Sequence, residues 1–243
     1  NLKRVNLELG GHAPFIVLDD ANVEEAAKAA HRRSFSNMGQ ICITVNRILV
    51  AKRVHKQFIE ALGSLTDETE IGDGLNDGIQ YGPVLNESVI KRVEAHKSDA
   101  IAKGGVLISG GERSSHVDHK NGFFYRPTVI DNAPLDSLPM VEESYGPLAA
   151  VAEFDNLGEM ITTANSLEYG LAAYVYGDSL ERAWSVAEQL EFGAVGVNVN
   201  DTSELHAPFG GWKMSGMGRE LGPEGLDAFL EPKHMKLRVR RYS

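Results

Sequence analysis

The chain has 243 residues, of which 42% are hydrophobic and 24% are charged, and these fractions are typical of a folded globular protein. An excess of 34 acidic over 24 basic residues gives a net charge of -10, which argues against binding to nucleic acid or to an anionic membrane surface. No apolar run is long enough for a spanning helix, and the first residues lack the apolar core of a signal peptide. These features predict a cytoplasmic protein.

Strand patterns and helix patterns alternate along the chain. Val5 to Leu9 alternates apolar and polar residues like a strand, as if the chain began inside a larger fold. Apolar, β-branched runs predict strands at 15–18, 47–51, 149–154, 171–176 and 194–199. Capping residues and apolar periodicity predict helices at 22–33, 86–103, 157–165 and 179–190. The alternation predicts an α/β fold in which helices flank a mostly parallel central sheet.

Glycine and proline concentrate in two later regions. Segment 109–147 is predicted to form long loops, which in α/β enzymes often carry functional residues. The segment after Gly210 leads through a short predicted helix at 223–230 into a final strand. This strand belongs to the basic run 233–241, whose alternating apolar and charged residues are typical of an edge strand protected by cations.

Cys42 is the only cysteine in the chain, so it can form neither an internal disulfide nor a thiolate metal site. It follows Gly39-Gln40-Ile41, between a predicted helix and a predicted strand, where backbone N–H groups can stabilise a thiolate and an oxyanion. Glu8 ends the first strand pattern and precedes Gly10 and Gly11, a setting in which a carboxylate can act as a base. The alternatives are an inert, buried cysteine and a solvated glutamate.

Two further segments could line a binding site. The run Glu142-Glu143-Ser144-Tyr145-Gly146-Pro147 combines carboxylates, which accept hydrogen bonds from ribose hydroxyls, with an aromatic ring that can pack on a planar group. An exposed acidic loop is the alternative. His206, Phe209, Trp212 and Lys213 cluster around a Gly-Gly pair, and they could line a pocket or simply pack within a loop. Because no histidine pair has zinc-ligand spacing, no metal is predicted.

Four motifs, in this order, resemble those of the NAD(P)-dependent aldehyde dehydrogenase superfamily. They are Glu8-Leu9-Gly10-Gly11, Gly39-Gln40-Ile41-Cys42, Glu142-Glu143-Ser144-Tyr145-Gly146-Pro147 and Pro208-Phe209-Gly210-Gly211-Trp212-Lys213-Met214-Ser215-Gly216. The resemblance covers essentially the whole chain, and the 34 positions that separate Glu8 from Cys42 also resemble the family's spacing. It implies that the chain is the catalytic domain of an aldehyde dehydrogenase.

The resemblance implies a role for each matching residue. Cys42 matches the nucleophile that forms a thiohemiacetal and then a thioester, and Glu8 matches the general base that activates the hydrolytic water. Glu143 matches the residue that holds the nicotinamide ribose, and Tyr145 stands where the family usually has Phe. The remaining matches are Leu9 at the nicotinamide end, Phe209 in the wall of the substrate tunnel, and Glu220 as an acid on the water path.

The family places a coenzyme-binding domain, with its Gly-rich turn and an oxyanion-hole asparagine, before the glutamate motif. The resemblance therefore divides the chain into the end of that domain (1–12), a catalytic domain (13–209), a return segment (210–234) and an oligomerisation strand (235–243). We expect the longer enzyme to use NAD or NADP, to oxidise a small aldehyde and to form a homodimer or homotetramer. The chain alone is expected to be nearly inactive as a dehydrogenase.

The substrate is less constrained. Family members that act on succinate semialdehyde place an arginine six positions before the nucleophile, where this chain has Ser36, and this difference counts against that substrate. Thr202, Ser203 and His206, in the loop at the family's substrate mouth, instead predict a polar aldehyde. Two other functions stay open: a stand-alone thiol esterase that uses Cys42, and an assembly module whose strand at 235–240 joins a partner's sheet.

Overall fold

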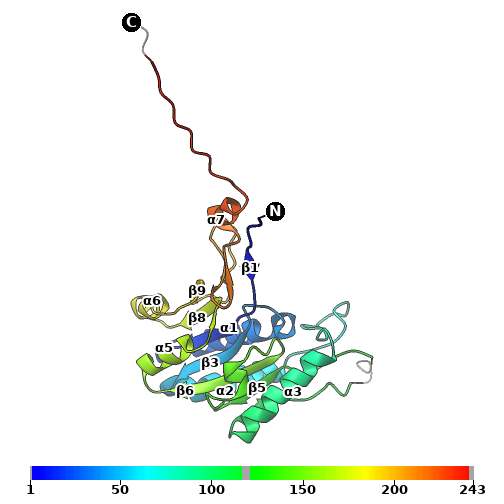
Figure 1. Ribbon diagram of the computed structural model, residues 1–243. Coiled ribbons are helices and arrows are strands. Elements are labelled where there is room, and N and C mark those ends of the chain that lie inside the picture. The colour runs from blue at the N-terminus through cyan, green and yellow to red at the C-terminus, as the bar shows by residue number, and fades with distance from the viewer. Residues whose placement is uncertain (1, 117–120, 241–243) are drawn as a thin grey trace.

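A seven-stranded sheet forms the centre of the molecule, with the strand order β4-β5-β6-β3-β2-β8-β9 (Figure 1). The computed structural model describes residues 2–116 and 121–240. The strands of this sheet are β2 (Ala13–Val17), β3 (Val45–Ala51), β4 (Val106–Ser109), β5 (Thr128–Asp131), β6 (Leu148–Phe154), β8 (Ala172–Tyr176) and β9 (Ala194–Val197). All neighbouring pairs are parallel except β4 with β5, so the predicted α/β fold with a mostly parallel sheet is confirmed.

Helices cover both faces of this sheet. On one face, α1 (Val23–Phe35) and α2 (Lys52–Asp67) pack in a core that includes Phe15 and Val17 of β2. On the other face, a second core includes Ile16, from the same strand, because successive side chains of a strand point to opposite faces. The helices of this second layer are α3 (Glu87–Ala102), α4 (Leu138–Val141), α5 (Leu157–Asn165) and α6 (Leu180–Glu188).

Two short antiparallel sheets join distant parts of the chain beside the central sheet. Strand β1 (Leu7–Glu8) pairs with β11 (Gly216–Met217), and β7 (Tyr169–Gly170) pairs with β10 (Trp212–Lys213). Beyond them lies α7 (Gly222–Asp227), after which the chain extends away from the central sheet (Figure 1). Within the described part of this tail, residues 228–240 form no strand and are exposed, while 241–243 lie outside the described residues. The predicted terminal strand therefore has no pairing partner in this part of the chain.

The structure also contains elements that the sequence patterns did not predict. Helix α2 begins directly after β3, without a side-chain cap, so no capping signal marks its start. Segment 109–147 was expected to be loop, yet it contains α4 and the wholly buried strand β5, which lies between β4 and β6. Strand β5 has four residues, directly preceded by Pro127, and such a short run shows too little periodicity to be recognised.

Candidate active site

The predicted site residues precede neighbouring strands of the central sheet. The segment with Glu8 leads into β2, the turn with Cys42 leads into β3, and the segment with Glu143 leads into β6. These strands are adjacent and parallel, so their amino ends lie along one edge of the sheet. Glu8 does end a strand, β1, but β1 lies outside the central sheet. The site therefore forms at the amino ends of the sheet strands, opposite to the carboxyl ends where open α/β sheets commonly bind ligands.

Gly10 and Gly11 bring the three segments into contact. The N–H of Gly11 donates a hydrogen bond of 3.1 Å to Oε1 of Glu143. A Cβ atom added at Gly11 would lie 2.6 Å from the carbonyl oxygen of Cys42, and one added at Gly10 would overlap the carboxylate of Glu143. Only glycine allows this close approach. Glu8, two positions before Gly10, lies close enough to Cys42 for its charge to act on the thiol.

A tight left-handed turn positions Cys42. The 3-10 turn η1 (Ser36–Gly39) follows α1, and its residues Asn37, Met38 and Gly39 have φ angles of 50°, 56° and 70°. At Gly39 an added Cβ would overlap the carbonyl oxygen of Gly146, so the Cys42 turn and the Glu143 segment touch here. Gln40 fixes the turn further, because its side-chain oxygen accepts a hydrogen bond of 2.8 Å from the N–H of Leu85.

Burial raises the pKa values of all three groups, and like charge adds to the rise for Glu8 and Cys42. The pKa of Glu8 is raised by burial and then by the charge of Glu220, and among the described residues neither carboxylate oxygen has a hydrogen-bond partner in normal geometry. Burial and the Glu8 charge raise the pKa of the Cys42 thiol, although the N–H groups of Cys42 and Ile43 oppose this rise. Burial likewise raises the pKa of Glu143, and the hydrogen bond from Gly11 opposes it. The site thus pairs a protonated thiol with a basic, poorly solvated carboxylate.

Comparisons with known proteins identify the family of this chain. Residues 1–235 match the sequence pattern described as "Aldehyde dehydrogenase family". The chain belongs to this family. It is 44% identical over 233 residues to the succinate semialdehyde dehydrogenase of Acinetobacter baylyi, covering 96% of this chain and 47% of that enzyme. The mitochondrial succinate-semialdehyde dehydrogenase of Rattus norvegicus is 42% identical, with 97% and 44% covered.

Solved structures of aldehyde dehydrogenases share the fold. An NADP dependent enzyme of E. coli has a TM-score of 0.90 at 41% identity, covering 94% of this chain and 47% of that one. Betaine aldehyde dehydrogenase of Staphylococcus aureus, solved with NAD+, has a TM-score of 0.91 at 36% identity, with 96% and 46% covered. The chain therefore spans about half the length of the relatives that it matches.

Other residues matched to aldehyde dehydrogenase roles lie around this site. Phe209 is buried in the same apolar cluster as Cys42, and a pair of backbone hydrogen bonds, each 2.7 Å, joins it to Glu220. Leu9 is exposed and its N–H donates a 3.0 Å hydrogen bond to the Ser215 carbonyl. Tyr145 is exposed and has a φ of 44°, a left-handed value that few aromatic residues adopt. Glu220 thus lies close enough to Glu8 for its charge to raise the pKa of that carboxyl, and Phe209 is tied to Glu220 through the backbone.

The loop after β9 lines a cleft of about 920 Å³ between that strand and α1. Its lining includes Thr202 and Pro208 of the loop. Ser203 and His206, which were expected at the substrate mouth, are exposed, and the described lining does not include them. The placement of this loop at a substrate mouth stays a prediction, and which of its side chains face the cleft depends on its detailed path.

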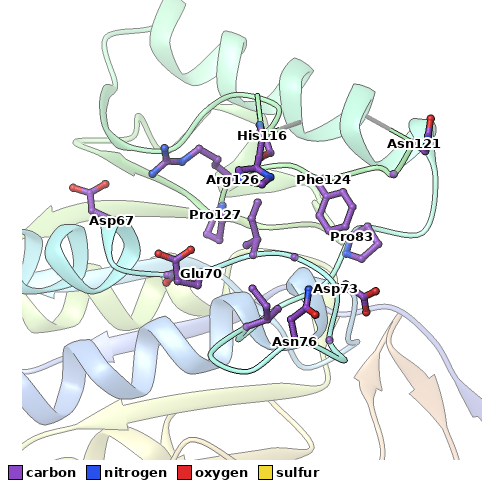
Figure 2. A pocket seen from close by; sticks show the side chains of 17 residues that line it. Asp67, Glu70, Asp73, Asn76, Pro83, His116, Asn121, Phe124, Arg126 and Pro127 are labelled. Atoms are coloured by element: carbon purple, nitrogen blue, oxygen red, sulfur yellow. The ribbon is translucent and has the colours of Figure 1, made fainter. Parts of the chain in front are cut away.

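A second cleft, of about 720 Å³, lies between segments 67–83 and 114–127 (Figure 2). Figure 2 shows Asp67 and Glu70 on one side of it and Arg126 nearby. None of the site residues expected from the aldehyde dehydrogenase motifs is among the described residues that line it. Over the described ranges 2–116 and 121–240, no group of three potential ligands is arranged to hold a metal ion, and no helix is long and apolar enough to cross a membrane.

Residues that no motif identified support the Glu143 segment from α3. His96 is buried, and its Nδ1 lies 2.9 Å from the hydroxyl of Ser144. Arg92 donates a hydrogen bond of 3.3 Å to the carbonyl of Ser144. Both residues lie on one predicted helix, and their spacing of four positions places them on the same face. The sequence therefore indicates that Arg92 and His96 share one face of a helix, but it does not show that this face contacts the Glu143 segment.

Proposed function

We propose that, in the protein that carries this chain, Cys42 and Glu8 catalyse the oxidation of an aldehyde to a carboxylic acid, with NAD or NADP as hydride acceptor. The observation that carries the proposal is the contact at Gly10 and Gly11, which brings the segment that carries Glu8 against Cys42 and Glu143. The named relatives, which are aldehyde dehydrogenases that this chain matches over about half their length, support it.

Cys42 performs the first half of the reaction. Because burial and Glu8 raise the pKa of its thiol, the resting group is protonated and must transfer its proton, for which Glu8 is the nearby base. The thiolate sulfur then adds to the aldehyde carbon and gives a thiohemiacetal oxyanion. The N–H groups of Cys42 and Ile43, which face the sulfur, supply donors next to this oxygen. Hydride loss from the same carbon leaves a thioester on Cys42.

Glu8 performs the second half. Glu8 first releases the proton that it took from the thiol to bulk water. Its carboxylate then accepts a proton from the hydrolytic water, the hydroxide oxygen bonds to the thioester carbon, and the C–S bond breaks to release the acid and the Cys42 thiolate. A raised pKa brings the basicity of Glu8 closer to neutral pH, which favours proton transfer from water. We propose that the negative charge of Glu220 helps to keep the pKa of Glu8 raised without direct contact. We also propose that Phe209 excludes water from the side of the site on which the thiol lies.

The residues available for the cofactor fit its nicotinamide end. When bound, the nicotinamide accepts the hydride that leaves the thiohemiacetal carbon. Glu143 is half-buried, and its carboxylate has acceptor capacity beyond the bond from Gly11, as a ribose hydroxyl requires. Leu9 and Tyr145 are exposed beside it and can contact the ring and the sugar.

The central experiment is a comparison of Cys42→Ser and Glu8→Gln in the full-length natural protein, with propanal as substrate and NAD or NADP in excess. Cys42→Ser should abolish NADH or NADPH formation. Glu8→Gln should turn over at least about 100-fold more slowly, because both the proton transfer from the thiol and the hydrolysis of the thioester lose their base. Wild-type steady-state rates in either variant would disprove the assigned roles.

A thiol esterase is the second candidate, because Cys42 and Glu8 adjoin without any contribution from a cofactor. Hydrolysis of p-nitrophenyl acetate that depends on Cys42, in a protein that does not reduce NAD or NADP, would favour it. The domain boundaries at 12, 209 and 234, a homodimeric or homotetrameric assembly through 235–243, and a cytoplasmic location all stay predictions.

A further inference from the structure

Ser144 anchors the segment that carries Glu143. It is fully buried, whereas its neighbours Glu143 and Tyr145 are half-buried and exposed, respectively. The hydroxyl of Ser144 lies 2.9 Å from Nδ1 of His96 in α3, a residue that is only 2% exposed. A hydrogen bond between two buried side chains does not compete with water, so it can fix the backbone at this point. Neither side chain takes part in the proposed reaction steps.

The ring of His96 is neutral near pH 7. Burial lowers its pKa and the charge of Arg92 acts in the same direction, while the charges of Glu142 and Asp99 oppose the shift. Nε2 lies 3.8 Å from the Glu142 carboxylate, which favours the tautomer with its proton on Nε2. Nδ1 then accepts the hydrogen bond that the Ser144 hydroxyl donates. His96 therefore serves in this contact as an acceptor at the Nδ1 position.

The face of α3 that carries His96 contacts the segment at two further points. Arg92, four positions earlier, donates a hydrogen bond of 3.3 Å to the Ser144 carbonyl. A Cβ atom added at Gly146 would lie 2.5 Å from a methyl carbon of Val93, so α3 packs directly on the backbone there. Positions 92, 93 and 96 lie on one side of a helix. The hydroxyl and the carbonyl of Ser144, and the backbone two positions later, are thus held by one helix.

The position of the Glu143 carboxylate depends on this anchor. The carboxylate ends a short side chain, and its Oε1 accepts the Gly11 N–H at 3.1 Å. To accept from a ribose hydroxyl as well, the carboxylate must keep its orientation, and its backbone must not move. The peptide bond that joins Glu143 to Ser144 is planar and stiff, so a fixed Ser144 restricts Glu143. Loss of the His96 acceptor leaves a buried hydroxyl without a partner, and the segment then shifts until the hydroxyl reaches another partner or water.

We propose that His96 is a positioning residue for the cofactor: through Ser144 it holds Glu143 in the place where its carboxylate meets the nicotinamide ribose. This inference rests on the proposed cofactor role of Glu143. Because His96 is only 2% exposed, it acts through the segment and not by touching the cofactor. The Cys42 turn contacts the same segment at Gly146, and the packing of α3 on Gly146 does not depend on His96. Removal of the His96 contact should therefore weaken cofactor binding more than it slows the chemical steps.

The test uses the full-length natural protein and measures the Kd of NAD and NADP by isothermal titration calorimetry without aldehyde. Steady-state kinetics with propanal then give kcat and the KM of the cofactor. His96→Leu, which removes the acceptor, should raise both Kd and KM by about 5- to 15-fold, as expected for one impaired hydrogen bond, and change kcat less than about threefold. His96→Asn, whose amide oxygen can take the position of Nδ1, should bind the cofactor within about threefold of wild type.

Ser144 provides a second, milder perturbation. Ser144→Ala removes only the hydroxyl and should weaken cofactor binding as much as His96→Leu does. Because the two side chains act through their mutual hydrogen bond, the double variant should bind no more weakly than either single variant, within about twofold. If His96→Leu does not fold, Ser144→Ala and His96→Asn decide the question.

His55 is a matched control for the loss of a buried histidine. It lies in α2, is 8% exposed, and its Nε2 lies 2.7 Å from a carboxylate oxygen of Asp131, the last residue of β5. This contact lies at the carboxyl ends of β3 and β5, whereas the proposed site lies at the amino ends of the sheet strands. His55→Leu should lower the Tm at least as much as His96→Leu and leave the Kd of NAD and NADP unchanged.

Glu143→Ala distinguishes this inference from the proposed function. If it binds NAD and NADP as wild type does, or if wild type binds neither, the proposed cofactor role of Glu143 fails and this inference fails with it. If Glu143→Ala weakens binding but Ser144→Ala or a folded His96→Leu does not, the role of Glu143 stands and the positioning inference is wrong. Weakening by His55→Leu equal to that by His96→Leu, or a loss of kcat with unchanged Kd, would indicate a merely structural role for His96 and would also overturn the inference.

Discussion

Gly39→Ala tests whether the contact between the Cys42 turn and the Glu143 segment sustains both stability and activity. Gly39 has a φ of 70°, and an added Cβ would overlap the carbonyl oxygen of Gly146 and lie 2.6 Å from its carbonyl carbon. The carbonyl of Ser34 would lie 3.0 Å away on another side. These neighbours are backbone atoms, which cannot move aside as a flexible side chain can. One of the two segments must therefore shift.

The magnitude follows from two separate costs. A left-handed conformation costs alanine roughly 1–2 kcal/mol relative to glycine. Overlap with packed backbone atoms adds about 1–3 kcal/mol. We therefore expect Gly39→Ala to lower the free energy of unfolding by about 3 kcal/mol and the Tm by roughly 6–12 °C. A displacement of Cys42 by about 1 Å should also reduce kcat by about 100-fold.

Gly78→Ala is a matched control. Gly78 has a φ of 83°, and none of the described atoms lies within 4 Å of the position that an added Cβ would take, so its alanine variant carries the backbone cost alone. It should lower the Tm by about 2–6 °C and leave kcat unchanged. Thermal unfolding and NADH or NADPH formation by both variants provide the measurement. If Gly39→Ala has the same Tm as Gly78→Ala and keeps the wild-type kcat, the reasoning is refuted.

Three further variants probe buried polar groups. In urea unfolding at pH 8, Glu8→Gln should be more stable than wild type. The pKa of Glu8 is higher in the folded state than in the unfolded state, so wild type loses stability as the pH rises from 4.5 through the raised pKa, and the glutamine variant does not. Burial lowers the pKa of His31 from 6.5 to about 4, so wild type should lose up to about 3 kcal/mol of stability as the pH falls through this window, and His31→Gln should flatten the profile. Arg47→Met should cost about 3 kcal/mol or more of unfolding free energy, because it leaves the carbonyls of His12, Thr163 and Ala164 without a donor. A Glu8→Gln midpoint equal to that of wild type at pH 8, a His31→Gln profile as steep as that of wild type, or an Arg47→Met midpoint equal to that of wild type would contradict the respective prediction.

The regular part of the fold could be predicted because its periodicity is local. The strands β2, β3, β6, β8 and β9 and the helices α1, α3, α5 and α6 all overlap predicted segments. Helix α2 is amphipathic, with Phe58 and Leu62 buried, but it lacks a cap and continues from a strand without a break. Strand β5 was missed because a buried strand of four residues resembles any short apolar run.

The site could be predicted as a set of motifs, but its contacts could not. Cys42, Glu8 and Glu143 stand out by residue type and order, whereas the overlap of Gly39 with Gly146 depends on how two distant loops meet. Arg33 shows the same limit. It adjoins Arg32 in sequence, and the direction in which each side chain leaves α1 makes one buried and the other exposed. Helical spacing places Arg33 three and four positions after the buried Ala30 and Ala29, but it does not show what the guanidinium contacts.

Glu143 links the proposed cofactor region to the proposed catalytic pair through one carboxylate. Its Oε1 accepts the Gly11 N–H, and Gly11 in turn packs against the carbonyl of Cys42. A carboxylate offers about four acceptor positions, so Glu143 can keep this bond while it accepts from a ribose hydroxyl. A ligand that displaces the Glu143 side chain should therefore also displace the segment 8–11, which carries Glu8 and contacts Cys42. The proposed cofactor-binding carboxylate and the proposed nucleophile therefore both contact the segment at positions 10 and 11. Only glycine at these two positions leaves room for both contacts.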